Sequence, residues 1–443
     1  GTEDNRVRKL DYSIQTSKLF YERFIEDGEI SLFSPHDVPG LYDAFGTPDF
    51  DELYVRYERD GSVPRKTVKA QALILDILKE RAETGRLYLM NIDHCNSHSS
   101  FIDKVEMSNL CQEITLPTDP IQHIDDASGE IALCVLSAVN VGKLRDLDDL
   151  EELCDLSVRG LEELIDYQDY PVVAAELATK ARRSLGIGYI GLAHFLAKNG
   201  LKYDSQEAWD RVHELTEAFQ YYLLKSSCKL AEQKGPCTDF NRTKYFEGIL
   251  PIDTYKRDVD EISSKELNYD WEALRSEIKV HGLRHSTLSA QMPSESSSVV
   301  SNATNGIEPP RGYLSIKKSK KGPLKQIVPQ YNTYKNNYTL LWDMPDNTGY
   351  INVVAVMQKF FDQAISGNWS YNPENYPDNE VPVSVMAQDF LRTYKYGWKT
   401  SYYQNTYDNK TDEIKEDTTK SQLDNILAEI MESSEEDCES CKI

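Results

Sequence analysis

The sequence predicts an α/β fold, since short strand-like runs alternate with long helical patterns over most of its 443 residues. Apolar residues recur at helical spacing over residues 68–83, and an apolar run typical of a strand follows at 86–93. No internal repeat and no Pro-rich or Gly/Ser-rich linker interrupts the chain before residue 400. One continuous domain is the simplest interpretation, and a barrel is one architecture with this alternation.

The next elements continue this order of strand and helix. Residues 130–139 form a continuous apolar run typical of a buried strand, in which Cys134 by itself would be an ordinary small core residue. A strand-like run also occurs at 109–116, and helical patterns occur at 147–167, 208–233 and 353–366.

Charge and composition exclude several classes of protein. A net charge of -24 disfavours an extended nucleic-acid surface, although a nucleotide could bind in a local pocket. No apolar run reaches the roughly 18 residues of a membrane span, and the first residues lack the apolar core of a secretory signal. Eight cysteines are scattered rather than densely paired. We therefore expect a cytoplasmic protein, in which a functional cysteine would be redox-active or catalytic.

The character of the chain changes after Gln404. From Asp408 to the end, twelve acidic residues stand against four lysines, which is typical of a mobile tail. Residues 1–404 are therefore expected to form the folded domain and 405–443 a flexible acidic tail. The tail ends in Cys438 and Cys441 with CxxC spacing, which favours thiol–disulfide exchange with another cysteine pair. Zinc is the competing interpretation, but the tail offers no histidine and no second pair.

A reactive cluster is predicted around Cys111. If residues 109–116 are extended, Asn109, Cys111 and Glu113 project from the same face. A thiol, a carboxylate and an amide together provide a sulfur centre, a proton acceptor and an orienting group. The alternative is an edge strand with one buried cysteine, because polar alternation is common on half-exposed strands.

Residues 293–297 suggest an anion site. Pro293 beside Ser294, Glu295, Ser296 and Ser297 is typical of a helix start, whose free backbone N–H groups attract phosphate. The alternative is a simple helix cap, which needs only one of the hydroxyls.

Tyr402 and Tyr403 are adjacent phenols just before the tail. Such a pair can pass an electron and a proton stepwise, because an oxidised phenol must also lose its proton. The sequence holds 27 tyrosines, and Tyr221 and Tyr222 are also adjacent within a helical pattern, so adjacency alone is weak support.

Three other motifs are given structural interpretations. Residues 186–191 match GxGxxG but follow a helical, basic stretch rather than a strand, so a dinucleotide site is not expected. His94, Cys95 and His98 lack further ligands at suitable spacing, and no metal site is predicted. The lysines near Gly322 are typical of a solvated hairpin: Lys317, Lys318, Lys320, Lys321 and Lys325.

Taken together, several segments resemble the large subunit of aerobic class I ribonucleotide reductases of enterobacterial and bacteriophage type. They are SNLCQEITLPT, GEIALCVLSAVNVG, RRSLGIGYIGLAHFLAKNG, MPSESSSVVSNATNGIEPPRGY, SYYQNT and the terminal CESCKI. The resemblance covers nearly the whole chain. It implies part of a ten-stranded α/β barrel, with Cys111 at the tip of an interior loop and residues 186–191 within the barrel.

The resemblance also implies roles in reduction of ribonucleoside diphosphates to deoxyribonucleoside diphosphates. Cys111 would become a thiyl radical and take the 3′ hydrogen, Glu113 would accept the 3′-hydroxyl proton and Asn109 would orient the ribose. Cys134 would be one of two cysteines that reduce the substrate. The remaining assignments are Cys438 and Cys441 as the tail pair that restores the reducing disulfide, Tyr402 and Tyr403 as radical relays, and Pro293, Ser294, Glu295, Ser296 and Ser297 as the diphosphate-binding segment.

The resemblance implies partners as well. No cofactor is expected on this chain itself, while a small radical-generating subunit would carry a tyrosyl radical and a di-metal centre. Thioredoxin or glutaredoxin would reduce the tail. Family members are much longer, so we expect an N-terminal portion with the ATP cone, the early barrel strands and the partner of Cys134 to come from another chain of a divided subunit, or the sequence to be a fragment. If phage-encoded, the protein would act in the host cytoplasm.

Two alternatives belong to other functional classes. The chain could be a non-catalytic assembly or regulatory piece that keeps the fold and only binds a partner. A simple dithiol oxidoreductase acting through the tail is disfavoured, because no thioredoxin-like βαβ unit surrounds the CxxC pair.

Overall fold

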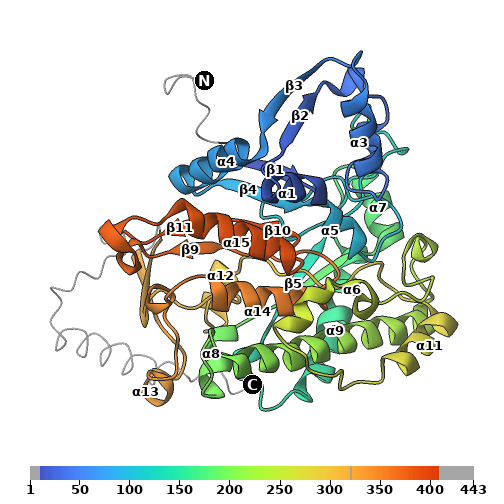
Figure 1. The fold of residues 1–443 in the computed structure, drawn as a ribbon. Coiled ribbons are helices and arrows are strands. Elements are labelled where there is room, and N and C mark those ends of the chain that lie inside the picture. The colour runs from blue at the N-terminus through green and yellow to red at the C-terminus, as the bar shows by residue number, and fades with distance from the viewer. Residues whose placement is uncertain (1–9, 320–321, 409–443) are drawn as a thin grey trace.

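The computed structural model describes residues 10–319 and 322–408. Its architecture is mixed α/β, as predicted (Figure 1). Strands β9, β10 and β11 and helix α15 lie between the N-terminal part, which contains β1 to β4, and the helical part, which contains α6, α9 and α11 (Figure 1). No helix of the described residues has both the length and the apolar character needed to cross a membrane.

The elements alternate along the chain. The strands are β1 Tyr12–Thr16, β2 Glu29–Phe33, β3 Arg65–Lys69, β4 Leu87–Asn91, β5 Val135–Asn140, β6 Leu185–Ile190, β7 Leu314–Ser319, β8 Gly322–Ile327, β9 Trp369–Tyr371, β10 Thr400–Ser401 and β11 Gln404–Thr406. The helices are α1 Lys18–Ile25, α2 Leu41–Ala44, α3 Phe50–Arg59, α4 Ala70–Thr84, α5 Ile92–Ser97, α6 Asp149–Tyr167, α7 Val173–Arg182, α8 Leu192–Lys198, α9 Gln206–Lys234, α10 Pro251–Thr254, α11 Trp271–His281, α12 Glu295–Val300, α13 Tyr331–Tyr334, α14 Thr348–Gln358 and α15 Val383–Lys395.

Paired strands form several small sheets rather than one closed ring within the described residues. Strand β4 is central to the largest sheet, with β1 parallel on one side and β10 antiparallel on the other. Strands β5 and β6 pair in parallel, as do β9 and β11. The lysine-rich stretch is a hairpin of β7 and β8, as the sequence predicts.

A parallel array extends from β5 and β6 into two segments with little regular structure. Bridges join Ile187 to Ser289 and Gln291 to Ile365, both in the parallel direction. Residues 287–291 and 363–366 therefore continue the direction of β6, and the array leads toward β9 through Gly367. The arrangement carries widely separated parts of the sequence to one place.

Two sequence-based boundaries are wrong. The helix predicted for 353–366 ends at Gln358, and residues 361–367 cross the parallel array instead. The buried strand predicted for 130–139 begins only at Val135, and Leu136 on it is 42% exposed. By contrast, the helix and strand predicted for 68–83 and 86–93 are α4 and β4.

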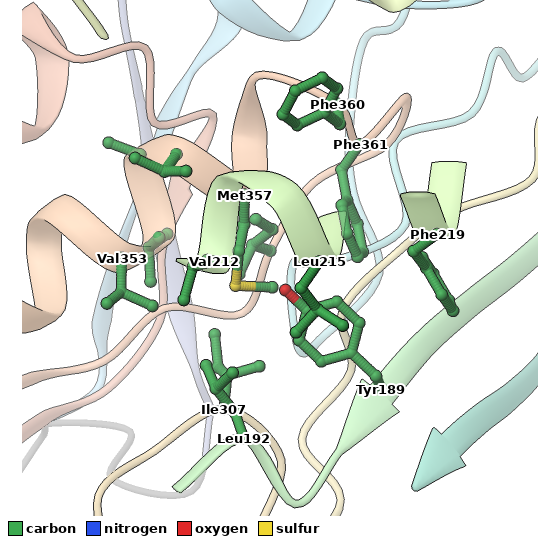
Figure 2. Packing of buried hydrophobic residues seen from close by; sticks show 14 of the residues in the cluster. Tyr189, Leu192, Val212, Leu215, Phe219, Ile307, Val353, Met357, Phe360 and Phe361 are labelled. Carbon is green, nitrogen blue, oxygen red and sulfur yellow. The ribbon is translucent and has the colours of Figure 1, made fainter. Parts of the chain in front are cut away.

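The helical part buries the main core. Helix α9 begins at a capping serine, Ser205, whose side chain accepts a hydrogen bond from Ala208 N. Its inner face packs against α14, where Val212 and Leu215 approach Val353 and Met357 (Figure 2). This layer supports β6 and the array from one side. Large apolar residues extend it toward the array: Tyr189, Phe219, Phe360 and Phe361.

The glycines of residues 186–191 have a packing role. Strand β6 is buried throughout, and a Cβ atom on Gly186 would lie 2.7 Å from Cys134 Sγ and 2.6 Å from Leu136 Cδ2. A Cβ atom on Gly188 would lie 2.7 Å from the carbonyl oxygen of Ala290. The glycines let neighbouring strands approach closely, so this motif does not form a phosphate-binding loop.

Replacement of Gly186 by alanine tests this packing. We expect G186A to lower the free energy of unfolding by about 1–3 kcal/mol, because the added methyl group pushes on β5. Urea unfolding followed by circular dichroism measures the change. The matched control is G160A on the exposed face of α6, where a Cβ atom meets no described atom within 4 Å, and which should gain up to about 1 kcal/mol. Equal stability of G186A and the wild-type chain would contradict the close approach.

Candidate active site

Cys111 lies on a turn rather than on the strand predicted from alternation. Asn109 accepts a hydrogen bond from Gln112 N at 3.2 Å, and Gln112 has a φ of 67°. The Asn109 side chain closes the loop, since its Oδ1 accepts from Ile114 N at 3.1 Å. The prediction of an extended segment is wrong, because these local bonds replace strand pairing. The structure contains a loop at this position, and a barrel interior around it stays an expectation from the family resemblance.

Glu113 and Cys111 meet at one serine. The Ser366 hydroxyl lies 2.5 Å from the carbonyl oxygen of Cys111 and 3.1 Å from Glu113 Oε2. Ala364 N also donates to the carbonyl oxygen of Glu113 at 3.0 Å. Burial raises the pKa of Glu113, and hydrogen bonds with Asn109 and Ser366 oppose the rise. A turn, rather than a strand, therefore brings together Asn109, Cys111 and Glu113 in one cluster.

Tyr402 provides the closest polar contact of the Cys111 thiol. Its hydroxyl donates to Cys111 Sγ at 3.2 Å, and the phenol itself is 4% exposed. The ring of Tyr403 lies beside it, tilted by 50° and with 4.0 Å between centroids, and Tyr88 adds a third ring 4.7 Å from Tyr402. Burial raises the pKa of Cys111, and the hydrogen bond from Tyr402 opposes that rise. A row of phenols therefore ends at the sulfur atom.

Cys134 reaches the same site from the residue before β5. Gln363 Nε2 donates to Cys134 Sγ at 3.5 Å, and Gln363 Oε1 accepts from Thr115 N at 3.3 Å. One side chain thus touches both the Cys111 loop and Cys134. Burial raises the pKa of the Cys134 thiol to about 12; the Gln363 hydrogen bond opposes this, and the Glu113 carboxylate adds to it.

The segment 293–297 begins α12, as predicted. It follows Gln291, which bridges to Ile365 next to Ser366, so the segment starts at the end of the array nearest the cluster. Ser294 is buried, whereas Glu295, Ser296 and Ser297 are exposed. The Ser294 hydroxyl donates to Met292 O at 3.2 Å, and no serine side chain caps the helix. Pro293 is also exposed, just outside the helix.

The histidines near Cys95 contact backbone carbonyl oxygens. His94 Nδ1 lies 2.9 Å from Trp398 O, and His98 Nε2 lies 2.7 Å from Gln358 O. Among residues 10–319 and 322–408, no three metal-binding side chains of His, Cys, Asp or Glu lie together. The redox pair predicted at Cys438 and Cys441 lies outside the described residues.

Sequence reasoning missed several residues that position the site. Arg81 is fully buried on α4 and donates to the carbonyl oxygens of Tyr402 at 2.7 Å and Tyr403 at 3.1 Å. Its guanidinium also lies over the ring of Trp369. Helical spacing places Arg81 on the apolar face of α4, a signal that could have drawn attention to it. No comparable sequence pattern pointed to Lys399, Gln363 or Ser366.

Fold and site together define an α/β domain with a thiol centre and an adjoining row of phenols. The sequence matches the family model described as "Ribonucleotide reductase, barrel domain" over residues 1–404. The chain therefore belongs to the ribonucleotide reductase barrel-domain family.

Curated relatives agree with this assignment. The ribonucleoside-diphosphate reductase subunit alpha of Haemophilus influenzae is 57% identical over 94% of this chain and 56% of the relative. The ribonucleoside-diphosphate reductase 1 subunit alpha of Escherichia coli is 52% identical over 93% of this chain and 55% of the relative. The ribonucleoside-diphosphate reductase subunit alpha of Enterobacteria phage T4 is 41% identical over 100% of this chain and 58% of the relative. The chain thus spans a little over half the length of these relatives.

Replacing Tyr402 by phenylalanine tests the thiol–phenol contact. We expect Y402F to slow alkylation of Cys111 at fixed pH by roughly threefold to tenfold, because loss of the donor raises the pKa of the thiol. Iodoacetamide labelling with peptide mass spectrometry gives the rate. Y403F is the control, since the Tyr403 ring lies against Tyr402 and no described hydrogen bond joins it to the sulfur. An unchanged alkylation rate of Cys111 in Y402F would contradict the hydrogen bond from Tyr402 to the thiol.

Proposed function

We propose that this chain carries the catalytic centre of a ribonucleoside-diphosphate reductase, an enzyme that makes deoxyribonucleoside diphosphates for DNA synthesis. The observation that carries the proposal is the contact of Tyr402 Oη with Cys111 Sγ at 3.2 Å, with the ring of Tyr403 against that of Tyr402. A thiol that ends a row of phenols is suited to lose an electron and a proton together. Membership in the family and the names of the relatives support the same activity.

In the proposed reaction, Cys111 loses one hydrogen atom toward Tyr402 and becomes a thiyl radical. The radical takes the 3′ hydrogen of the ribose, and Glu113 accepts the proton of the 3′ hydroxyl. Asn109, which already closes the loop, orients the ribose hydroxyls. Burial favours the neutral form of Glu113, so the carboxylate readily retains a proton once it has taken one.

Reduction of the substrate needs two further electrons and two protons. Cys134 supplies half of each as it forms a disulfide with a second thiol, while the 2′ hydroxyl leaves as water. Cys111 then returns the hydrogen atom to C3′ and becomes the thiyl radical again, and Glu113 returns its proton to the 3′ oxygen. We propose that Cys438 and Cys441 exchange with that disulfide and that thioredoxin or glutaredoxin restores them. Pro293, Ser294, Glu295, Ser296 and Ser297 would hold the diphosphate at the start of α12.

The proposal also names partners. A small subunit with a tyrosyl radical and a di-metal centre would supply the one-electron oxidising equivalent through Tyr403 and Tyr402. An N-terminal large-subunit portion would complete the barrel. Strand β1 leaves the edge opposite β4 without a strand partner among the described residues, and such an edge can accept another strand.

The first experiment measures turnover of the reconstituted complex. The C111S variant should lose reduction of a ribonucleoside diphosphate completely, because a serine hydroxyl does not form the corresponding radical, while substrate binding persists. C154A on α6 serves as control, since Cys154 is buried in the core away from the cluster and its loss should leave turnover in place. Substantial turnover by C111S would contradict the proposal. Inactivity of the wild-type complex, with all partners present, would favour a non-catalytic assembly role.

The pH dependence of turnover tests Glu113 as the base. Removal of the Ser366 hydroxyl takes away a hydrogen bond that lowers the pKa of Glu113, so S366A should raise that pKa further. The base acts only when deprotonated, so activity is lost as pH falls through the pKa. The acidic limb of the profile of kcat/KM should therefore move to higher pH in S366A. If the acidic limb of the S366A profile lies at the same pH as that of the wild-type enzyme, Glu113 is not the base.

A further inference from the structure

Gln363 is fully buried at the centre of the site, and both its backbone and its side chain are fixed. Its N–H donates to Ser289 O at 3.0 Å, and its carbonyl oxygen accepts from Lys399 Nζ at 2.8 Å and from Gln358 Nε2 at 2.9 Å. Its amide reaches three different segments: Thr115 of the Cys111 loop, Leu185 of β6, and Cys134.

The hydrogen-bond partners determine the orientation of the Gln363 amide. Oε1 accepts from Thr115 N, and Nε2 donates to Leu185 O at 2.9 Å. A flipped amide would set its oxygen against Leu185 O and its NH₂ group against Thr115 N, and both contacts would be repulsive. The amide nitrogen therefore faces the sulfur of Cys134 and donates a hydrogen bond to it at 3.5 Å.

The remaining surroundings of Cys134 disfavour the thiolate. The sulfur is packed against Gly186, and the carboxylates of Glu113 and Asp362 both raise its pKa. A hydrogen bond to a sulfur atom stabilises the thiolate relative to the thiol, and thiol exchange proceeds through the thiolate. The hydrogen bond from Gln363 therefore opposes part of the rise in the pKa of Cys134 that burial and the two carboxylates cause.

We propose that Gln363 is a positioning residue that couples the Cys111 loop to Cys134. Its amide oxygen holds the loop at Thr115 while its amide nitrogen holds the sulfur, so a change in bonding at Cys134 alters the support of the loop. This inference rests on the proposed function, in which Cys134 changes its bonding in every turnover. It assigns Gln363 no contact with substrate.

The first test measures the thiol itself in the full chain, without turnover. In Q363M, alkylation of Cys134 by iodoacetamide at fixed pH should slow by roughly threefold to tenfold, because the N–H donor is gone. In Q363E the acceptor for Thr115 persists but the donor is replaced by an oxygen, so the rate should fall further. The matched control is Q404M, since Gln404 is also buried and its Nε2 donates to Met386 Sδ rather than to a cysteine.

A second test uses the C111S chain, so that iodoacetamide does not also modify the peptide whose exchange is measured. Alkylation of Cys134 removes the partner of Gln363 Nε2, and hydrogen exchange of the peptide covering residues 109–116 should then become several-fold faster. The peptide covering α11 serves as the internal control, because it lies elsewhere in the helical part.

The inference is overturned if alkylation of Cys134 leaves exchange in 109–116 unchanged. It is also overturned if folded Q363M and Q363E react at the wild-type rate, or if Q404M slows Cys134 equally. These readouts need no substrate or partner. An inactive wild-type complex with the expected thiol and exchange behaviour would therefore count against the proposed function and leave the coupling in place.

Discussion

The Lys399 ammonium supports the segment on which the site is built. It is fully buried and donates to the carbonyl oxygens of Phe361 at 3.4 Å, Asp362 at 2.8 Å and Gln363 at 2.8 Å. The next residues of the segment make the contacts of the cluster: Ala364 with Glu113, Ser366 with Cys111 and Glu113, and Gly367 with Tyr402. Burial lowers the pKa of Lys399 to about 7, and carbonyl dipoles replace the water that the ammonium lost.

A second buried cation anchors the tyrosines in the same way. Arg81 donates to the carbonyl oxygens of Leu87, Tyr402 and Tyr403, and burial lowers its pKa to about 10. Residues 399–403 are thus held by Lys399 on one side and Arg81 on the other, with Thr400 Oγ1 also donating to Ile365 O. Removing either cation would take a charged donor away from these buried carbonyls, and each carbonyl that has no second donor would cost about 1–3 kcal/mol. The position of Tyr402 against Cys111 follows from this double anchoring.

Sequence patterns predicted the regular elements better than the site. Helix α4 and strand β4 were predictable because one has a clear 3.6-residue period and the other a short apolar run before a polar turn. The pattern of α14 continues into residues 360–366, since a buried extended segment is as apolar as a buried helix. Helix α14 ends at Gln358, and Asp362 in the following segment accepts from Leu288 N and Ser289 N, which lie more than 70 residues away. No local pattern carries that information.

By itself, the sequence determined the chemistry available: a thiol between an amide and a carboxylate, an adjacent pair of phenols, a second cysteine and a hydroxyl-rich helix start. The tertiary structure alone decided how they meet. The Cys111 loop is a turn, and Gln363, which lies more than 200 residues further along the chain, joins it to Cys134. The physical reason is that residue spacing specifies geometry within one helix or strand, whereas contacts between segments depend on burial and on satisfying every buried polar group.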